Sequence, residues 1–112
     1  DWNLPDDYNN VIVVDSDEEL ARYIASESGE NYPAVDFSKY TMIIAHGYSL
    51  NGISNKQIES FQSISATEIA LNIAIYQDMT DVVEPWTIAL HVDKWDRLYN
   101  IDLRVVYRDV IN

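Results

Sequence analysis

Residues 67–77, with the sequence TEIALNIAIYQ, constrain the fold of this chain more than any other segment. Branched apolar side chains occupy every second position, and small or polar side chains alternate with them. Successive side chains of a β-strand point to opposite faces, so this alternation predicts a strand that is packed on one face and at least partly wet on the other. The apolar face would carry Ile69, Leu71, Ile73 and Ile75.

Shorter patterns of the same kind predict five further strands, and one helix is predicted near the start of the chain. Ser16 followed by Glu19 three residues later forms a capping box, which indicates a helix from about residue 17 to residue 26. Gly29 is suited to the chain reversal after it. The expected strands are residues 11–14, 40–46, 57–64, 66–77, 86–92 and 101–107.

This element order predicts the α+β class: a single domain in which one N-terminal helix packs on a mostly antiparallel sheet of five to six strands. Residues 1–10 contain Pro and several Asp and Asn, and we expect them to form an irregular arm, while residues 11–112 form the domain. Strands 66–77 and 86–92 follow one another along the chain, so we expect them to be neighbours in the sheet.

The composition excludes several classes of function. Nineteen acidic residues against seven basic ones leave a formal net charge of −12, which repels nucleic-acid backbones and anionic membrane surfaces. The chain has no cysteine, so disulfides, thiolate metal sites and cysteine nucleophiles are excluded. Its uninterrupted apolar runs are too short for a membrane-spanning helix.

No motif in the sequence predicts a catalytic residue, a metal site or a cofactor. The only two histidines, His46 and His91, lack the spacing of a metal-binding motif, and we expect each to be satisfied by a hydrogen bond. The acidic run at residues 15–19 begins like a calcium loop, but it lacks the required Gly and Glu at later positions. Glycine-rich phosphate loops and nucleophile elbows are also missing from the sequence.

The aromatic residues are the best candidates for binding. Eight Tyr and three Trp exceed what a small core requires, and Tyr and Trp are favoured in recognition surfaces. We expect Tyr48, Tyr76 and Trp86 to form a binding face, with Tyr76 and Trp86 on either side of an acidic loop at residues 78–85. The alternative, that these rings cover the sheet edges and cap the core, is at least as consistent with the sequence.

One stretch resembles a known family. Residues 35–39, Val-Asp-Phe-Ser-Lys, follow a Glu-Glu-Leu helix and lead into an apolar strand. They resemble a signature of the C-terminal domain of PrcB-like protease-complex accessory proteins and of related short exported lipoproteins of Bacteroidetes. A later strand that begins Pro-Trp-Thr-Ile, at residues 85–88, is also similar. The resemblance implies an exported, lipid-anchored domain at the periplasm or cell surface, without catalytic residues.

The sequence therefore favours a non-catalytic accessory or binding domain of the cell envelope that acts through contact with a protein partner. A small carbohydrate- or ligand-binding module is the first alternative, and a hydrolase of unknown class is the second. A protein-binding domain should expose an apolar patch or an open sheet edge. A ligand-binding module should instead have a concave pocket flanked by aromatic rings.

Overall fold

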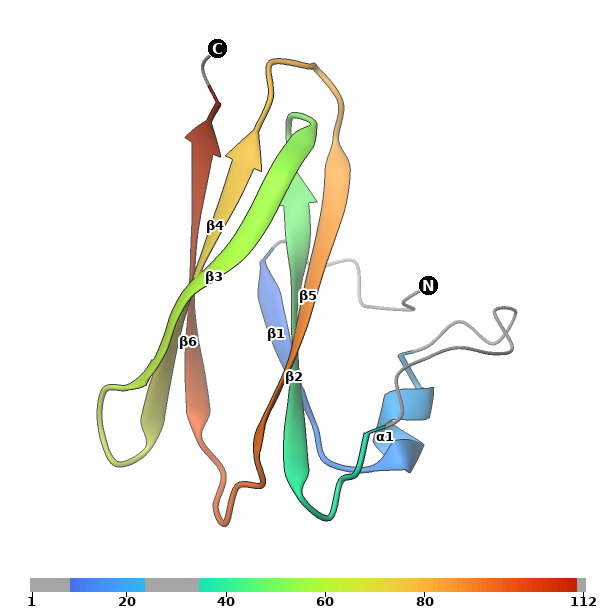
Figure 1. Cartoon of the computed structure of the whole chain (residues 1–112), viewed down its shortest axis with the longest axis vertical. Helices are drawn as coiled ribbons and strands as arrows, with labels where there is room; N and C mark the ends of the chain where they lie inside the picture. Colours follow the sequence, from blue (N-terminus) through green and yellow to red (C-terminus); the bar gives the residue numbers. More distant parts are fainter. Residues whose placement is uncertain (1–8, 24–34, 111–112) are drawn as a thin grey trace.

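The structure is a computed structural model, and it describes residues 9–23 and 35–110 (Figure 1). Strands account for 62% of the described residues and helix for 5%. The expected elements occur in the expected order, although most strands extend further than the sequence indicated. Their bounds are β1 Asn10–Val14, α1 Asp17–Ala21, β2 Tyr40–Ser49, β3 Ile53–Ser63, β4 Glu68–Gln77, β5 Glu84–Asp93 and β6 Asn100–Asp109.

The six described strands form two separate sheets of three. One sheet has the order β1-β2-β5 and is antiparallel throughout. The other has the order β3-β4-β6, in which β4 is antiparallel to β3 and parallel to β6. The chain crosses to the other sheet between β4 and β5 and returns before β6. The expectation that residues 66–77 pair with residues 86–92 is therefore wrong.

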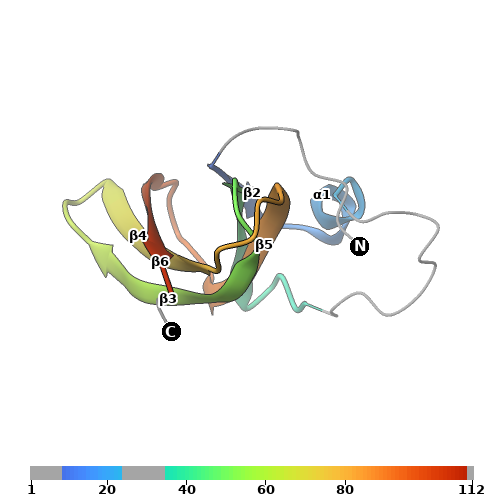
Figure 2. The ribbon, with the colours of Figure 1, turned by 90° about the horizontal axis from the view of Figure 1, so that it is seen from above.

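The main core lies between the two sheets, which pack against each other (Figure 2). Ile43 and Ala45 of β2 meet the alternating apolar face of β4, and these side chains are completely buried. The alternation in residues 67–77 thus correctly predicted a strand with one packed face. The buried members of this core are Ile43, Ala45, Leu71, Ile73, Ile75 and Trp86.

The predicted α+β class, with a helix packed on one sheet of five to six strands, is wrong. The helix α1 spans only five residues, and its capping box is formed as predicted, because the amide of Glu19 donates to Oγ of Ser16 at 3.1 Å. Leu20 of α1 packs on the outer face of β1 and β2. This short helix covers one part of one sheet, so most of the apolar surface is buried between the sheets instead. The expected end of the helix at residue 26 lies outside the described residues.

Hydrogen bonds of Asp36 close the turn before β2. The Asp36 carboxylate accepts hydrogen bonds from the hydroxyl and the amide of Ser38, at 2.5 and 3.0 Å. The hydroxyl bond, followed by the amide bond, lowers the pKa of the Asp36 carboxyl below its ordinary value of 3.8. Phe37 is half-buried and packs against the smaller apolar cluster around Leu20. The turn is therefore anchored to the outer face of the first sheet.

The hydroxyl of Tyr107 connects the two sheets at the opposite end of the molecule. Tyr107 lies on β6, and its oxygen accepts a hydrogen bond from the indole nitrogen of Trp86 on β5, at 3.1 Å. The same oxygen lies 2.8 Å from the carbonyl oxygen of Tyr48 on β2 and 2.6 Å from Oδ1 of Asn9. Gly47 is required beside this group, because an added Cβ would meet the Trp86 ring at 2.9 Å.

We predict that Tyr107→Phe lowers the free energy of unfolding by about 1–3 kcal/mol, because it leaves the Trp86 indole and a strand carbonyl without their partner. Denaturant unfolding measures this change. The control is Tyr40→Phe, which removes a hydroxyl from an exposed ring at the other end of β2. A Tyr107→Phe variant as stable as the control would show that the hydroxyl does not hold the sheets together.

Candidate functional site

The three aromatic residues expected to form one binding face lie in three different places. Tyr48 is half-buried on β2, four residues after Ile44, so it lies on the same outer face of the β1-β2-β5 sheet. Tyr76 is half-buried on the outer face of the other sheet, where Gln57 donates to its hydroxyl at 3.3 Å. Trp86 lies between the sheets and is 2% exposed. The structure therefore does not bring these rings together.

The position of Trp86 follows from its register. Trp86 is paired with Gly47 of β2, and the missing side chain there leaves space for the indole over the strand. A partner could not reach this ring without moving a core residue. The interpretation of Trp86 as an exposed recognition residue is thus corrected, whereas binding by Tyr48 or Tyr76 stays a prediction.

The histidines do not form a pair. His46 is 4% exposed on β2, while His91 is exposed on β5 and opposite Met42 in the ladder. The ring of His91 lies 6.3 Å from that of Tyr40, measured between centroids. Within residues 9–23 and 35–110, no three His, Cys, Asp or Glu side chains gather in an arrangement that could hold a metal ion.

An exposed apolar surface is found instead on two adjacent loops, residues 50–52 and residues 78–83, which we call the loop tip. They lie at one end of the sandwich, where β2 turns into β3 and β4 connects to β5 (Figure 1). Four large apolar side chains of these loops are between 55% and 79% exposed. They are Leu50, Met79, Val82 and Val83.

Hydrogen bonds hold the two loops of the tip together. The side-chain amide of Asn51 donates to the carbonyl oxygen of Thr80 at 2.9 Å, and the backbone amide of Gly52 donates to the Thr80 hydroxyl at 3.1 Å. In return, the amide of Asp78 donates to the carbonyl oxygen of Gly52 at 2.9 Å. The exposed apolar side chains therefore project from two loops that hydrogen bonds hold in a fixed relative position.

A buried bond supports the tip from below. The Ser49 hydroxyl, at the end of β2, donates to Oε1 of Gln77 at the end of β4 at 2.7 Å. Both side chains are buried, so water does not compete for this bond. It joins the last residue of a strand in one sheet to the last residue of a strand in the other. The two loops consequently begin from fixed positions.

Carboxylates accompany the apolar side chains of the second loop of the tip. Asp78, Asp81 and Glu84 lie on or beside the second loop, and neither residues 49–55 nor residues 77–86 contain Lys or Arg. The Asp78 carboxylate accepts from the hydroxyl and the amide of Thr80, at 2.5 and 2.9 Å. The hydroxyl bond, followed by the amide bond, lowers the pKa of the Asp78 carboxyl below 3.8 and keeps it charged. The tip thus combines apolar groups with negative charge.

A shallow depression of about 320 Å³ lies beside the tip, between the start of β3 and the start of β5. Two of its charged groups already bind the protein itself: the Lys56 ammonium donates to the carbonyl of Thr87 at 2.7 Å, and Glu84 accepts from the amide of Ile53 at 3.2 Å. The depression is lined by residues 53–56 and 84–86. These two charged groups therefore hold β3 against β5.

The sequence predicted one part of the loop tip, its acidic second loop. It placed an acidic loop at residues 78–85, where the second loop of the tip lies. It did not identify Met79, Val82 and Val83, because single apolar residues inside a loop carry no periodicity. One signal in the sequence could have indicated exposed apolar groups: two adjacent valines, Val82 and Val83, stand between two acidic residues.

Comparisons of the chain with protein-family models, with curated proteins and with solved structures found no match in any of the three. Within the described part of the chain, no helix is both long enough and apolar enough to cross a membrane.

We predict that Asp78→Asn makes the protein less stable at neutral pH, with a difference that depends on acidity. The folded carboxyl has a pKa below 3.8, so its contribution is complete above the unfolded value and is lost as the pH falls through the folded value. The difference from the wild type should be constant above about pH 5 and shrink at lower pH.

Denaturant unfolding at several pH values measures this effect. The matched control is Asp81→Asn, which removes a carboxylate from the same loop and leaves the bonds to Thr80 in place. A stability difference for Asp78→Asn that stays the same at low pH would contradict the prediction.

Proposed function

We propose that this protein is a non-catalytic binding domain that contacts a protein partner through the loop tip. The observation that carries the proposal is the group of four exposed apolar side chains on two hydrogen-bonded loops. Contiguous exposed apolar groups with a polar rim are typical of protein-interaction sites. The proposal keeps the function expected from the sequence and moves the binding residues from the aromatic rings to the tip.

The hydrogen bonds within the tip support binding as much as its apolar groups do. Association costs conformational entropy when loops must become ordered at the interface. Here the bonds of Thr80 to Asn51 and Gly52 already fix the relative position of the loops. Full burial of one Val, Leu or Met side chain contributes about 1.5–3 kcal/mol, which offsets part of the cost of association.

The charge of the tip indicates the chemistry of the partner. Asp78, Asp81 and Glu84 are not balanced by a basic residue within the two loop segments, and the whole chain carries a net charge of −12. A partner surface with an apolar centre and surrounding Lys or Arg would complement this arrangement. Such complementarity mainly raises the association rate and makes binding weaker at high salt.

The two alternatives have less support. The depression beside Trp86 would be the place for a sugar or another small ligand, but its indole is buried and its charged groups bind the protein backbone. A hydrolase would require converging polar groups, and His46 and His91 lie on different strands without a shared cleft among the described residues.

The combined variant Met79→Ser, Val82→Ser, Val83→Ser tests the proposal. We predict that it captures at least about tenfold less of the partner from an extract of the native cells, with an unchanged free energy of unfolding within about 0.5 kcal/mol. Crosslinking followed by quantitative mass spectrometry measures the capture.

The matched control for this experiment is Leu98→Ser. Leu98 is 84% exposed and lies in the connection between β5 and β6, at the opposite end of the sandwich (Figure 1). The Leu98→Ser substitution removes an apolar group that is even more exposed than those of the tip, and it leaves the tip unchanged. Equal capture by the wild type and the triple variant would refute the proposed site, and so would equal losses in the triple variant and the control.

We also propose that the domain works in the cell envelope as part of an exported, lipid-anchored protein. The support is the resemblance of residues 35–39 to the signature of exported bacterial domains. We predict that the natural gene product, tagged at its C-terminus, fractionates with the envelope and incorporates a labelled fatty acid. Its recovery in the cytosolic fraction, without label, would contradict this proposal.

A further inference from the structure

The outer edge of β5 has backbone groups that no described strand uses. The amide of Lys94 donates to the carbonyl of Lys39 at the β2 side. Backbone groups alternate in direction along a strand, so the even-numbered residues of β5 bond to β2 and the odd-numbered ones point away. The carbonyl of Thr87, which receives the Lys56 ammonium, points away as expected. The residues of β5 whose backbone amide and carbonyl groups point away from β2, beyond Thr87, are Ala89, His91 and Asp93. We call them the β5 edge.

The other described sheet edges are protected against strand pairing, but the β5 edge is not. β3 has register shifts between Ile53 and Asn55 and between Ile58 and Ser60, and such bulges disrupt an edge. β6 carries charged residues along its length, and β1 has only five residues. β5 pairs with β2 over ten residues without a register shift. Beyond Pro85, residues 86–92 contain no charged Asp, Glu, Lys or Arg.

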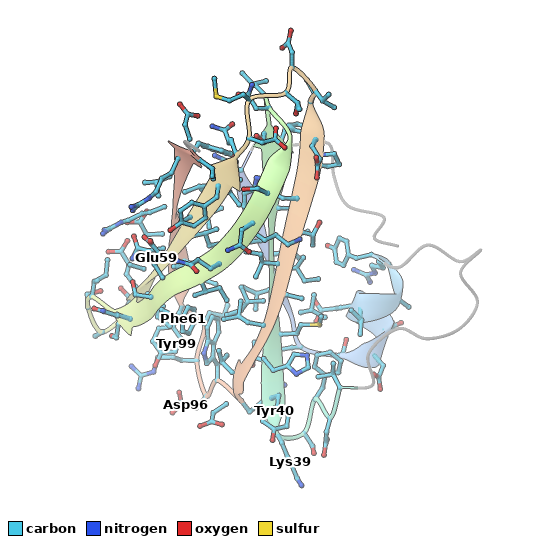
Figure 3. The ribbon with its side chains drawn as sticks, turned by 45° about the horizontal axis from the view of Figure 1, so that its top comes forward. Lys39, Tyr40, Glu59, Phe61, Asp96 and Tyr99 are labelled. Atoms are coloured by element: carbon cyan, nitrogen blue, oxygen red, sulfur yellow. The ribbon has the colours of Figure 1, made fainter. Side chains whose placement is uncertain are left out.

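Partly exposed core residues lie next to the β5 edge. Ile88, Leu90 and Val92 pack against the main core but are only partly buried. Ile58 of β3 is opposite the buried Ile73 in the ladder, so it points to the same side, and yet it is 38% exposed. The lower halves of β3 and β5 diverge (Figure 1), and Phe61 of β3, labelled in Figure 3, is also partly buried there.

We propose that the β5 edge receives an extended segment of a basic protein partner as a fourth strand of the β1-β2-β5 sheet. An extended chain can pair with a row of alternating amide and carbonyl groups along its whole length, in place of water. Inward-pointing residues of the added strand would cover Leu90, Val92 and Ile58, so alternate positions of the segment are apolar. This site is separate from the loop tip and does not depend on it.

Charge favours a basic partner segment over a second copy of this chain. β5 has carboxylates at both ends, Glu84 and Asp93, and no Lys or Arg between them. Two copies paired along this edge would each bring a net charge of −12. A segment with Lys or Arg at its outward positions removes that repulsion.

The experiment uses a short synthetic peptide with Val and Lys at alternate positions, added to the full chain. We predict that hydrogen exchange of the Ala89 and His91 amides slows at least about tenfold when the peptide binds. The control peptide has the same sequence and charge but carries N-methyl groups on the amides that would face the edge. It should give no protection, because it lacks the ladder donors.

Variants at one position provide a second test. Ala89→Pro removes an outward-pointing amide that does not bond to β2, and it should abolish peptide binding, while Ala89→Ser keeps the amide and should bind as the wild type does. The triple variant of the loop tip should also bind the peptide unchanged, which separates this site from the proposed function.

Four outcomes would overturn the proposal. These are no protection of the Ala89 and His91 amides, equal binding of the N-methylated peptide, and loss of peptide binding in the tip variant. The fourth is concentration-dependent protection of the same amides without peptide, because it would identify a second copy of the chain as the occupant of the edge.

Discussion

The end of the sandwich that carries the loop tip depends on one contact, the hydrogen bond between the Trp86 indole and the Tyr107 hydroxyl. β5 and β6 belong to different sheets, so no backbone ladder can hold them together. The hydroxyl, with the Tyr48 carbonyl beside it, joins β2, β5 and β6 at one point. The Ser49–Gln77 bond acts nearby in the same way between β2 and β4. These polar contacts fix the strands from which the loops of the tip begin, in addition to the apolar packing between the sheets.

The sequence predicted the strands well but not their arrangement. Alternation in residues 67–77 depends only on which side of one strand is buried, and it identified β4 with its buried face. It does not indicate which strand is the neighbour. β4 pairs with β6, which is distant in sequence, and this pairing requires the chain to pass through the other sheet as β5. The expected single sheet was wrong because sequence neighbours were assumed to be spatial neighbours.

The sequence predicted those features that depend only on hydrogen bonds between residues close together in the chain. The capping box at Ser16 depends on bonds within a few residues, and it is formed as expected. The role of Trp86 depends on its position opposite Gly47, a residue of a different strand, so sequence could not distinguish a core ring from an exposed one. The apolar tip depends on two loops that approach each other from separate strand connections. An acidic loop was visible in the sequence, but its apolar surface was not.

The strong negative charge explains how an open edge and an apolar tip can coexist in one domain. An unprotected strand edge and exposed Val, Leu and Met side chains both favour self-association. Copies that each carry a net charge of −12 repel one another, and this repulsion opposes pairing at both surfaces. The same charge attracts a basic partner. The acidic residues therefore protect the domain against self-association, as the bulges of β3 protect that edge. They also provide a selectivity between partners that apolar contacts alone cannot provide.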